Sequence, residues 1–547
     1  MNYSTHIVMK KLSIFFIVAL CSLACGKDKL NLTDPGNFTP QQFYKTQSDM
    51  DAAVIGAYGK LRDVYNGYFY YWGEIRSDNT SFFNPSVDRN SINLLAPVQV
   101  TYVEVNNFWN NLYLAIIAAN TILQKVDGAT YTSDAVKNQH IGEAKLIRAL
   151  CYFYLARTYG GYGLDGSLLG VPLVTQQLSA DAARKMQRSS LEDTYALIVN
   201  DLIDAKAKLP ASNSGANVGR VTSVSAQALL GKVYMFMAGY PLNKGNDYYT
   251  KAAGEFKPVI DNPALSLVTS YVKLFDSNNK NSSEAIIEIQ FKSDLTNKTG
   301  NAFQSKMLTS AAAAALVPAG DAGTADNKPN STLLNAYAAG DPRKSVTWRP
   351  GYKQSSGSYK TEAYGHKYWQ QLGADKSNVD SYLNWDCNWK ELRLAEVYLL
   401  YAEALVRSGG DKNTALIYLN KIRQRARNTS KTDDPTIATI ETQYPSWNTG
   451  DPSVSLKDYD LSDFASDNDF LLAIENESRV EFALENKRWY DLVRTQRAPA
   501  VMTASSPIDE NTTITWNDRD YALPIPQNAM INSNPGVVIQ NKGYTQL

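Results

Sequence analysis

Two stretches of this chain have the pattern of amphipathic helix pairs joined by a short turn, and the two pairs are similar in length. Residues 391–426 hold two apolar-periodic segments around the turn SGGDKN, and residues 223–260 repeat that arrangement. In both stretches, small residues recur where the two helices must approach closely. Because a helical hairpin of ~34 residues cannot bury its apolar face alone, it stacks on the next hairpin. We therefore predict a mostly α-helical fold built on a scaffold of tetratricopeptide-like helical pairs.

Apolar residues at helical spacing predict further helices outside these two windows. Thr39 and Pro40 are expected to cap and open the first of them. Strand signals are few, and the best is AIIEIQF at 285–291. The scaffold is expected to occupy residues 39–261 and 390–495. Its predicted helices are 39–65, 106–126, 133–160, 190–209, 222–238, 246–260, 390–408, 411–427 and 467–495.

Residues 292–389 differ from the scaffold in amino-acid composition. Gly, Ser, Asn and Asp are frequent there, and four tryptophans stand in irregular sequence. A disordered linker would be poor in aromatic residues, so we interpret this region as an ordered, loop-rich lobe inserted into a single large domain. Long ordered loops are usually functional, and the lobe is therefore expected to contribute to a site.

The N-terminus has the features of a targeting signal. Lys10 and Lys11 precede residues 12–23, a mainly apolar run with the length of a signal-peptide core and too short to span a bilayer. Ala24 places a small side chain directly before Cys25, as signal peptidases require. Residues 1–24 are therefore expected to be removed, which leaves a mature chain of residues 25–547.

The residues around Cys25 resemble a bacterial lipoprotein box, in which the cysteine thiol is acylated before cleavage. Several acyl chains, at ~0.8 kcal/mol per buried methylene, would anchor the protein to a membrane. Cys21 is the competing cysteine, but the bulky Leu20 before it suits the peptidase less well. An ordinary secretory signal without acylation is the alternative, and a complete signal also begins at Met9. The sequence GKDKLNL after the cysteine resembles the surface-export signals of Bacteroidetes lipoproteins.

Charge and motif content exclude several classes of function. Loss of the signal leaves 52 basic and 54 acidic side chains, a balance that gives no attraction to nucleic acid. The three histidines are scattered, and no nucleotide-binding or hydrolase fingerprint is present. We therefore expect no catalysis, no cofactor and no metal. Cys151 and Cys387 are the thiols that remain beside Cys25; Cys151 has the pattern of a buried core residue, and a disulfide between the two stays open.

Five local patterns, in order along the chain, resemble the RagB/SusD family of outer-membrane nutrient-binding lipoproteins. They are the lipoprotein box with LNLTDPGNFTPQQFYKTQSDMDAAVIGAYGKL, then FWNNLYLAIIAANTIL, LLNAYAAGDPRKS, ELRLAEVYLLYAEALVR with LNKIRQRA, and ENESRVEFALENKRWYDLVRT with ALPIPQNAMINSNPG. The resemblance implies a single, mostly helical domain, lipid-anchored at the outer membrane and facing the outside. It also implies a partner, a SusC-like TonB-dependent transporter, and an oligosaccharide ligand. Two alternatives remain: a peptide-binding uptake protein of the same family, and a scaffold that binds only protein partners.

The segment 68–90 joins the first two helices and mixes aromatic with polar side chains. Sugar recognition uses such a mixture, because aromatic faces cover the C–H side of a pyranose while planar polar groups bind adjacent hydroxyls. Sugar-binding members of the family contact ligand from the corresponding segment, and phenylalanine here replaces the tryptophan of the starch-binding members. The alternative for Tyr70–Trp72 is a buried rim of the helix pair. The resemblance points to Phe82, Phe83, Asn84 and Arg89, with Asp78 and Trp72 beside them.

The lobe is expected to supply a second wall, with Trp348, Tyr364 and Trp369 as candidates. Two other charged patterns are interpreted as structural. Asp341 and Arg343 are expected to form a local salt bridge that holds a turn. The acidic row Glu477, Glu481 and Glu485 has arginines within one or two turns, so ion pairing explains it without catalysis.

Overall fold

The computed structural model describes residues 43–83, 86–293, 299–316, 326–354, 356–368, 385–504 and 513–547. Three predicted site residues, Cys25, Asn84 and Trp369, lie outside these ranges, as does the expected cap at Thr39. Within the described part the fold is mostly helical, with a few short strands, and one hydrophobic core runs from the first helix to the C-terminal segment. The predicted fold class, a single mostly helical domain, is confirmed.

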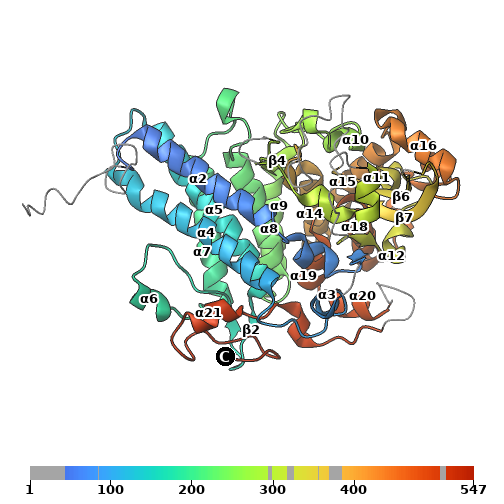
Figure 1. Cartoon of the computed structure of the whole chain (residues 1–547). Coiled ribbons are helices and arrows are strands. Elements are labelled where there is room, and N and C mark those ends of the chain that lie inside the picture. Colours follow the sequence, from blue (N-terminus) through green and yellow to red (C-terminus); the bar gives the residue numbers. More distant parts are fainter. Residues whose placement is uncertain are drawn as a thin grey trace, which may run out of the picture.

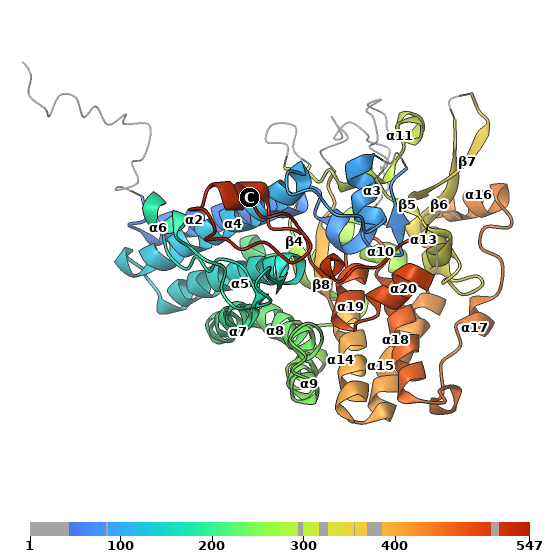
Figure 2. The same cartoon turned by 90° about the horizontal axis from the view of Figure 1, so that it is seen from below.

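A continuous array of long helices forms the scaffold (Figures 1 and 2). Each helix packs against the next one along the chain, and α14 packs on α9, which joins the two separated parts of the scaffold. Small residues lie where helices meet, as predicted: Ala252 and Ala415 are fully buried. The array consists of α2 (Gln47–Tyr65), α4 (Val103–Lys125), α5 (Asp134–Tyr159), α7 (Leu191–Lys208), α8 (Ser223–Ala238), α9 (Asn246–Ile260), α14 (Leu394–Ser408) and α15 (Lys412–Arg427).

Two of these helices, α2 and α14, begin several residues later than predicted. Thr46, whose hydroxyl accepts the N–H of Asp49 while the Asp49 carboxylate accepts the Thr46 N–H, caps α2, which therefore starts at Gln47. Residues 389–393 form strand β8 (Trp389–Arg393) instead of the first turn of α14. This strand pairs antiparallel with β4 (Ala285–Ile289), which confirms the strand predicted at 285–291.

The helix predicted at 467–495 is two helices, α18 (Asp467–Glu481) and α19 (Arg488–Arg494). Leu484 and Asn486 between them have φ angles of 66° and 60°, a left-handed conformation that ends a right-handed helix. The buried carboxylate of Glu74 accepts the N–H groups of Leu484, at 3.0 Å, and Asn486, at 3.2 Å. These bonds satisfy backbone donors that the break would otherwise leave without a partner.

The described part of the loop-rich lobe is ordered and packs beside α3 (Val87–Asn93) (Figure 2). Its largest element is an antiparallel hairpin, and β1 (Thr80–Ser81) pairs with β5 (Lys328–Pro329) to tie the lobe to the segment that follows η2 (Tyr71–Ile75). The lobe holds η6 (Phe303–Met307), α11 (Ser310–Leu316), β5 (Lys328–Pro329), α12 (Ser331–Leu334), α13 (Pro342–Thr347), β6 (Trp348–Lys353) and β7 (Tyr359–Gly365).

Shorter elements connect the long helices. The helices are η2 (a π-helix, Tyr71–Ile75), α6 (Ala180–Arg184), α10 (Tyr271–Leu274), α16 (Pro435–Gln443), α17 (Pro452–Ser455), α20 (Ala498–Ala504), η10 (Asp518–Tyr521) and α21 (Gln527–Ile531). The strands are β1 (Thr80–Ser81), β2 (Gly161–Tyr162) and β3 (Leu168–Leu169). No helix in the described ranges is both long and apolar enough to cross a bilayer.

Cys151 and Cys387 are both buried free thiols, so they form no disulfide with each other. Burial raises the pKa of the Cys387 thiol to about 12. Both therefore act as small apolar core residues.

Candidate functional site

The segment between α2 and α4 is mostly buried, although its aromatic content suggested a surface. Trp72, in η2, is 1% exposed, and Phe82, after β1, is 5% exposed. Asp78 is also buried, and its carboxylate pairs with Arg479 and Arg488 of α18 and α19, each at 2.8 Å. These three candidates are thus occupied by packing and ion pairing, and none presents a face to a ligand in this structure.

The two lobe candidates that the structure describes are buried as well. Trp348, at the start of β6, is fully buried in the main core. Tyr364, on β7, is 4% exposed and packs with Tyr352 and Trp385 in a separate small apolar cluster. Trp348 thus packs into the core of the scaffold, whereas Tyr364 packs within the lobe. They form no exposed second wall.

Phe83 and Arg89 are the predicted residues that keep accessible surface within the described part of the chain. Phe83 is half-buried, and the Arg89 side chain, on α3, is 26% exposed. The Arg89 guanidinium lies over the Phe82 ring, with its carbon 5.1 Å from the ring centroid. Its Nη2 atom is 3.3 Å from a carboxylate oxygen of Asp326. Arg89 is therefore held in place at the edge of the protein by an aromatic ring and a buried acid.

Asp326 is the buried acid that contacts several side chains of this region. It is fully buried, and one carboxylate oxygen accepts hydrogen bonds from the hydroxyls of Tyr70, at 2.8 Å, and Tyr71, at 3.3 Å. Burial, followed by the Asp326 charge, raises the pKa of both phenols, which keeps them neutral donors. Burial opposes a charge on Arg89, but the Asp326 carboxylate outweighs it and raises the arginine pKa. The pairing of β1 with β5 brings Asp326 to this position.

A second cation lies close by. The Nζ atom of Lys306, in η6, is 4.7 Å from the centroid of the Tyr68 ring, which contacts Tyr71 in turn. Burial lowers the pKa of Lys306, and Asp326 partly offsets that effect. We call the residues Tyr68, Phe83, Arg89, Lys306 and Asp326 the Arg89 cluster. It combines partly exposed ring faces with charged donors, which suits a ligand rich in hydroxyl groups.

Local sequence reasoning missed Lys306 and Asp326. Asp326 lies 256 positions from Tyr70, its hydrogen-bond partner, and stands in no motif that marks it. Asp326 reaches this position only because two strands from distant segments pair. To predict its role from the sequence, one would have to know which distant segments meet in the folded protein.

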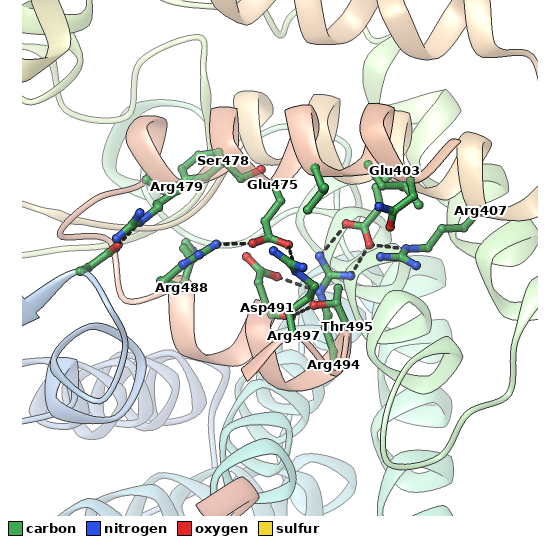
Figure 3. Close-up of a pocket in the computed structure, with 16 residues that line it drawn as sticks. Glu403, Arg407, Glu475, Ser478, Arg479, Arg488, Asp491, Arg494, Thr495 and Arg497 are labelled. Atoms are coloured by element: carbon green, nitrogen blue, oxygen red, sulfur yellow. Dashed lines mark hydrogen bonds and ion pairs between the residues drawn. The ribbon is translucent and has the colours of Figure 1, made fainter. Parts of the chain in front are cut away.

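Figure 3 shows another candidate, a small pocket between α14, α18 and α19 with a volume of about 120 Å³. Its charged side chains point toward one another and are paired. Arg488 contacts Glu475 at 3.0 Å, and Arg494 contacts Glu403 at 2.7 Å and Asp491 at 2.8 Å. Because each of these charges already has a partner, the pocket holds helices together and offers little to a ligand.

The acidic row Glu477, Glu481 and Glu485 is ion-paired, as predicted, but most of its partners come from other elements. Asp341 and Arg343 do form the predicted salt bridge, at 2.8 Å, and Arg343 continues to Glu477 and Glu481. The nearby arginines of the motif instead pair with Asp78, Glu475 and Glu403. The remaining pairs of the row are Glu477–Arg423, Glu481–Arg393, Glu481–Arg425, Glu485–Lys367 and Glu485–Arg393.

The fold and the site together define a class: a helical-repeat protein with an inserted lobe and an aromatic, charged patch at the junction. Comparison with known protein families identifies the family of this chain. The sequence profile of the SusD family matches residues 296–544, and a SusD-like profile described as "Starch-binding associating with outer membrane" matches residues 36–235. The chain belongs to the SusD family, also called RagB/SusD.

Individual relatives are distant in sequence and similar in fold. A SusD-like protein of Bacteroides ovatus is 27% identical over 514 residues, which cover 89% of this chain and 83% of that protein. A SusD superfamily structure from Parabacteroides distasonis has a TM-score of 0.74 at 22% identity, over 93% of this chain and 100% of that one. Surface glycan-binding protein A from Bacteroides thetaiotaomicron, solved in complex with laminarihexaose, has a TM-score of 0.68 at 21% identity, over 91% and 100% of the two chains.

Proposed function

We propose that this protein is an outer-membrane lipoprotein that binds an oligosaccharide at the Arg89 cluster and delivers it to a SusC-like TonB-dependent transporter. It carries out no catalysis. Cys25 bears the lipid, and the bound sugar lies against Phe83 while Arg89 donates to its hydroxyls. Asn84, between Phe83 and α3 in sequence, belongs to the same proposed surface. Trp72, Asp78, Phe82, Trp348 and Tyr364 support the fold around it and are not proposed as ligand contacts.

The position of Arg89 is the observation that carries this proposal. A guanidinium that is partly exposed, stacked on an aromatic ring and backed by a buried carboxylate is preorganised to donate hydrogen bonds. Family membership supports the ligand class, because one matching profile is described as starch-binding and a structural neighbour was solved with laminarihexaose. The same profile description supports outer-membrane association.

The experiment is retention of the soluble form, residues 26–547, on a panel of polysaccharides in native affinity gels. Phe83→Ala and Arg89→Ala are run beside the unaltered protein. Arg497→Ala is the matched control, because Arg497 is exposed to a similar degree but lies beside Glu475 in the pocket of Figure 3. We expect one glycan to retard the unaltered protein and the control, and both cluster variants to migrate freely.

Three results would count against the proposal. Retardation that persists in both variants would place the sugar elsewhere on the protein. Retention of peptides from a protein digest, with no glycan retained, would instead identify the peptide-binding alternative. Shortening of the bound polymer during the assay would reveal catalysis.

A further inference from the structure

A second and larger cavity lies on the helical scaffold and shares no lining residue with the Arg89 cluster. Its volume is about 680 Å³, within the range of small-molecule sites. The ends of α5, α7 and α8, together with α19, η10 and the C-terminal segment, form its walls. Figure 1 shows β2 and the C-terminus together at this end of the helical array.

One wall of the cavity carries a buried guanidinium that lacks a hydrogen bond. Arg157, in the last turn of α5, is 8% exposed, and its guanidinium carbon is 3.9 Å from the Tyr154 ring centroid and 4.2 Å from that of Tyr490. Among the described residues it forms one ion pair, with Glu391 at 4.0 Å, and its buried Nε atom has no acceptor. A buried donor without an acceptor is costly, and Arg157 lines the cavity, so an anionic or acceptor group bound there would supply the missing partner.

Tyrosines form the apolar surface of the same cavity. The rings of Tyr240 and Tyr521 are 4.3 Å apart between centroids and inclined by 38°, and both side chains are partly exposed. Tyr162, on β2, is 45% exposed. Such rings present flat apolar faces with hydroxyl groups at their edges, which is the surface that a pyranose ring covers.

Three of the four charged side chains that line the cavity are basic. Arg157, Arg519 and Lys542 line it together with one acid, Asp518. Two buried acids outside the lining pair with the arginines, Glu391 with Arg157 at 4.0 Å and Asp520 with Arg519 at 3.3 Å. Lys542 is exposed, so it can meet a ligand at the entrance. Because a guanidinium binds a planar carboxylate through two parallel hydrogen bonds, a carboxylate fits Arg157 better than a neutral hydroxyl does.

We propose that this cavity is a second saccharide site, specific for a unit that carries a carboxylate, a uronic acid. The pyranose ring lies against Tyr240 and Tyr521, and the carboxylate reaches Arg157 from the cavity while Lys542 attracts it at the entrance. This goes beyond the Arg89 cluster, which has a different position and different charges. The protein would thereby hold an acidic glycan at two separate points.

The test is isothermal titration calorimetry of residues 26–547 with trigalacturonate, with the neutral galactose trisaccharide and with a tyrosine-containing tripeptide. Arg157→Lys removes the paired donors of the guanidinium and keeps the charge. Lys542→Glu reverses an exposed charge at the entrance, and Tyr521→Ala removes one of the two adjacent rings, which also packs against the main core. Lys125→Glu is the matched control, because Lys125 is exposed at the end of α4 and lines neither site. Arg89→Ala reports on the first site.

We expect trigalacturonate to bind the unaltered protein, with a Kd at least tenfold higher in Arg157→Lys and Lys542→Glu and unchanged in Lys125→Glu. Arg89→Ala should leave this binding unchanged while it abolishes polysaccharide retention on gels, so the two proposals fail separately. Equal affinity for the neutral trisaccharide would overturn the inference. So would absence of uronate binding to the folded protein, indifference to all three cavity variants, or cavity-dependent binding of the tripeptide alone.

Discussion

The substitution Glu481→Gln tests whether buried ion pairs hold the lobe and the C-terminal helices to the scaffold. Glu481 is fully buried, and its carboxylate contacts Arg343 of α13 at 3.0 Å, Arg393 of β8 at 2.7 Å, and Arg425 of α15. Glutamine keeps the shape but removes the charge that these guanidinium groups share. Breaking such a buried network costs about 3–5 kcal/mol, because uncompensated charges stay inside the protein.

The expected change in melting temperature follows from the size of the chain. Unfolding entropy is ~2.1 cal/mol/K per residue, which gives about 1 kcal/mol/K for roughly 500 residues. A loss of about 3–5 kcal/mol therefore lowers Tm by about 3–5 °C, a shift that scanning calorimetry at pH 7 resolves. Burial opposes ionisation of Glu481, but Arg425, Arg393 and Arg343 lower its pKa below the ordinary range. This stabilisation is present above the unfolded pKa and is lost on acidification, so the difference in Tm should shrink below pH 4.5.

Glu475→Gln is the control, since Glu475 lies on the same helix and also pairs with two arginines. Its side chain is 17% exposed, and its loss should lower Tm by no more than about 1 °C. Equal shifts in the two variants, or a shift under about 1 °C for Glu481→Gln, would refute the idea that the buried network matters more than ordinary ion pairs.

Three further outcomes are expected. Burial opposes ionisation of Glu403, but Arg494 and Arg407 lower its pKa to about 2. The ionised carboxylate therefore contributes about 3 kcal/mol of stability above pH 4.5, and this contribution is lost toward pH 2. Glu403→Gln should accordingly lower Tm at pH 7 and not at pH 2. A Cβ atom on Gly231 would lie 2.6 Å from the Phe256 ring, so Gly231→Ala should lower the free energy of unfolding, measured by chemical denaturation, by about 1–3 kcal/mol. Gly254 faces open space on α9, so Gly254→Ala should raise it by about 0.5–1 kcal/mol. The same sign for both variants would contradict the close approach of α8 and α9. Finally, the two buried thiols should react with a thiol reagent only after unfolding; rapid reaction of the native protein would show that the core opens.

The helical scaffold could be predicted closely because its signals are local. The helix expected at 133–160 is found at Asp134–Tyr159, and that at 246–260 is found at Asn246–Ile260, because apolar spacing and short polar flanks mark both. The break after Glu481 was missed because neither Leu484 nor Asn486 is a glycine, and Glu74, from a distant segment, stabilises the turn.

The candidate site was predictable only in part, for a similar reason. An aromatic segment is compatible both with a surface for ligands and with a core, and sequence alone does not say which rings are covered. Tyr70 and Tyr71 are buried because Asp326 accepts their hydroxyl groups. Trp348 is buried because β6 turns it into the main core. Phe83 and Arg89 remain accessible at the edge of the same segment, and no local pattern distinguishes them from their buried neighbours.

The pairing of β4 with β8 has a consequence for how such a protein can diversify. Ile289 and Trp389 are register partners, so the chain leaves the scaffold and returns to it at adjacent positions. An insertion whose two ends are already joined can change in length at a cost that grows only slowly with the number of residues. The loops of the lobe can therefore vary in length and sequence while the helices on either side keep their packing. The buried lobe residues cannot vary in this way, because Trp348 is part of the main core and Arg343 pairs with Glu477 and Glu481.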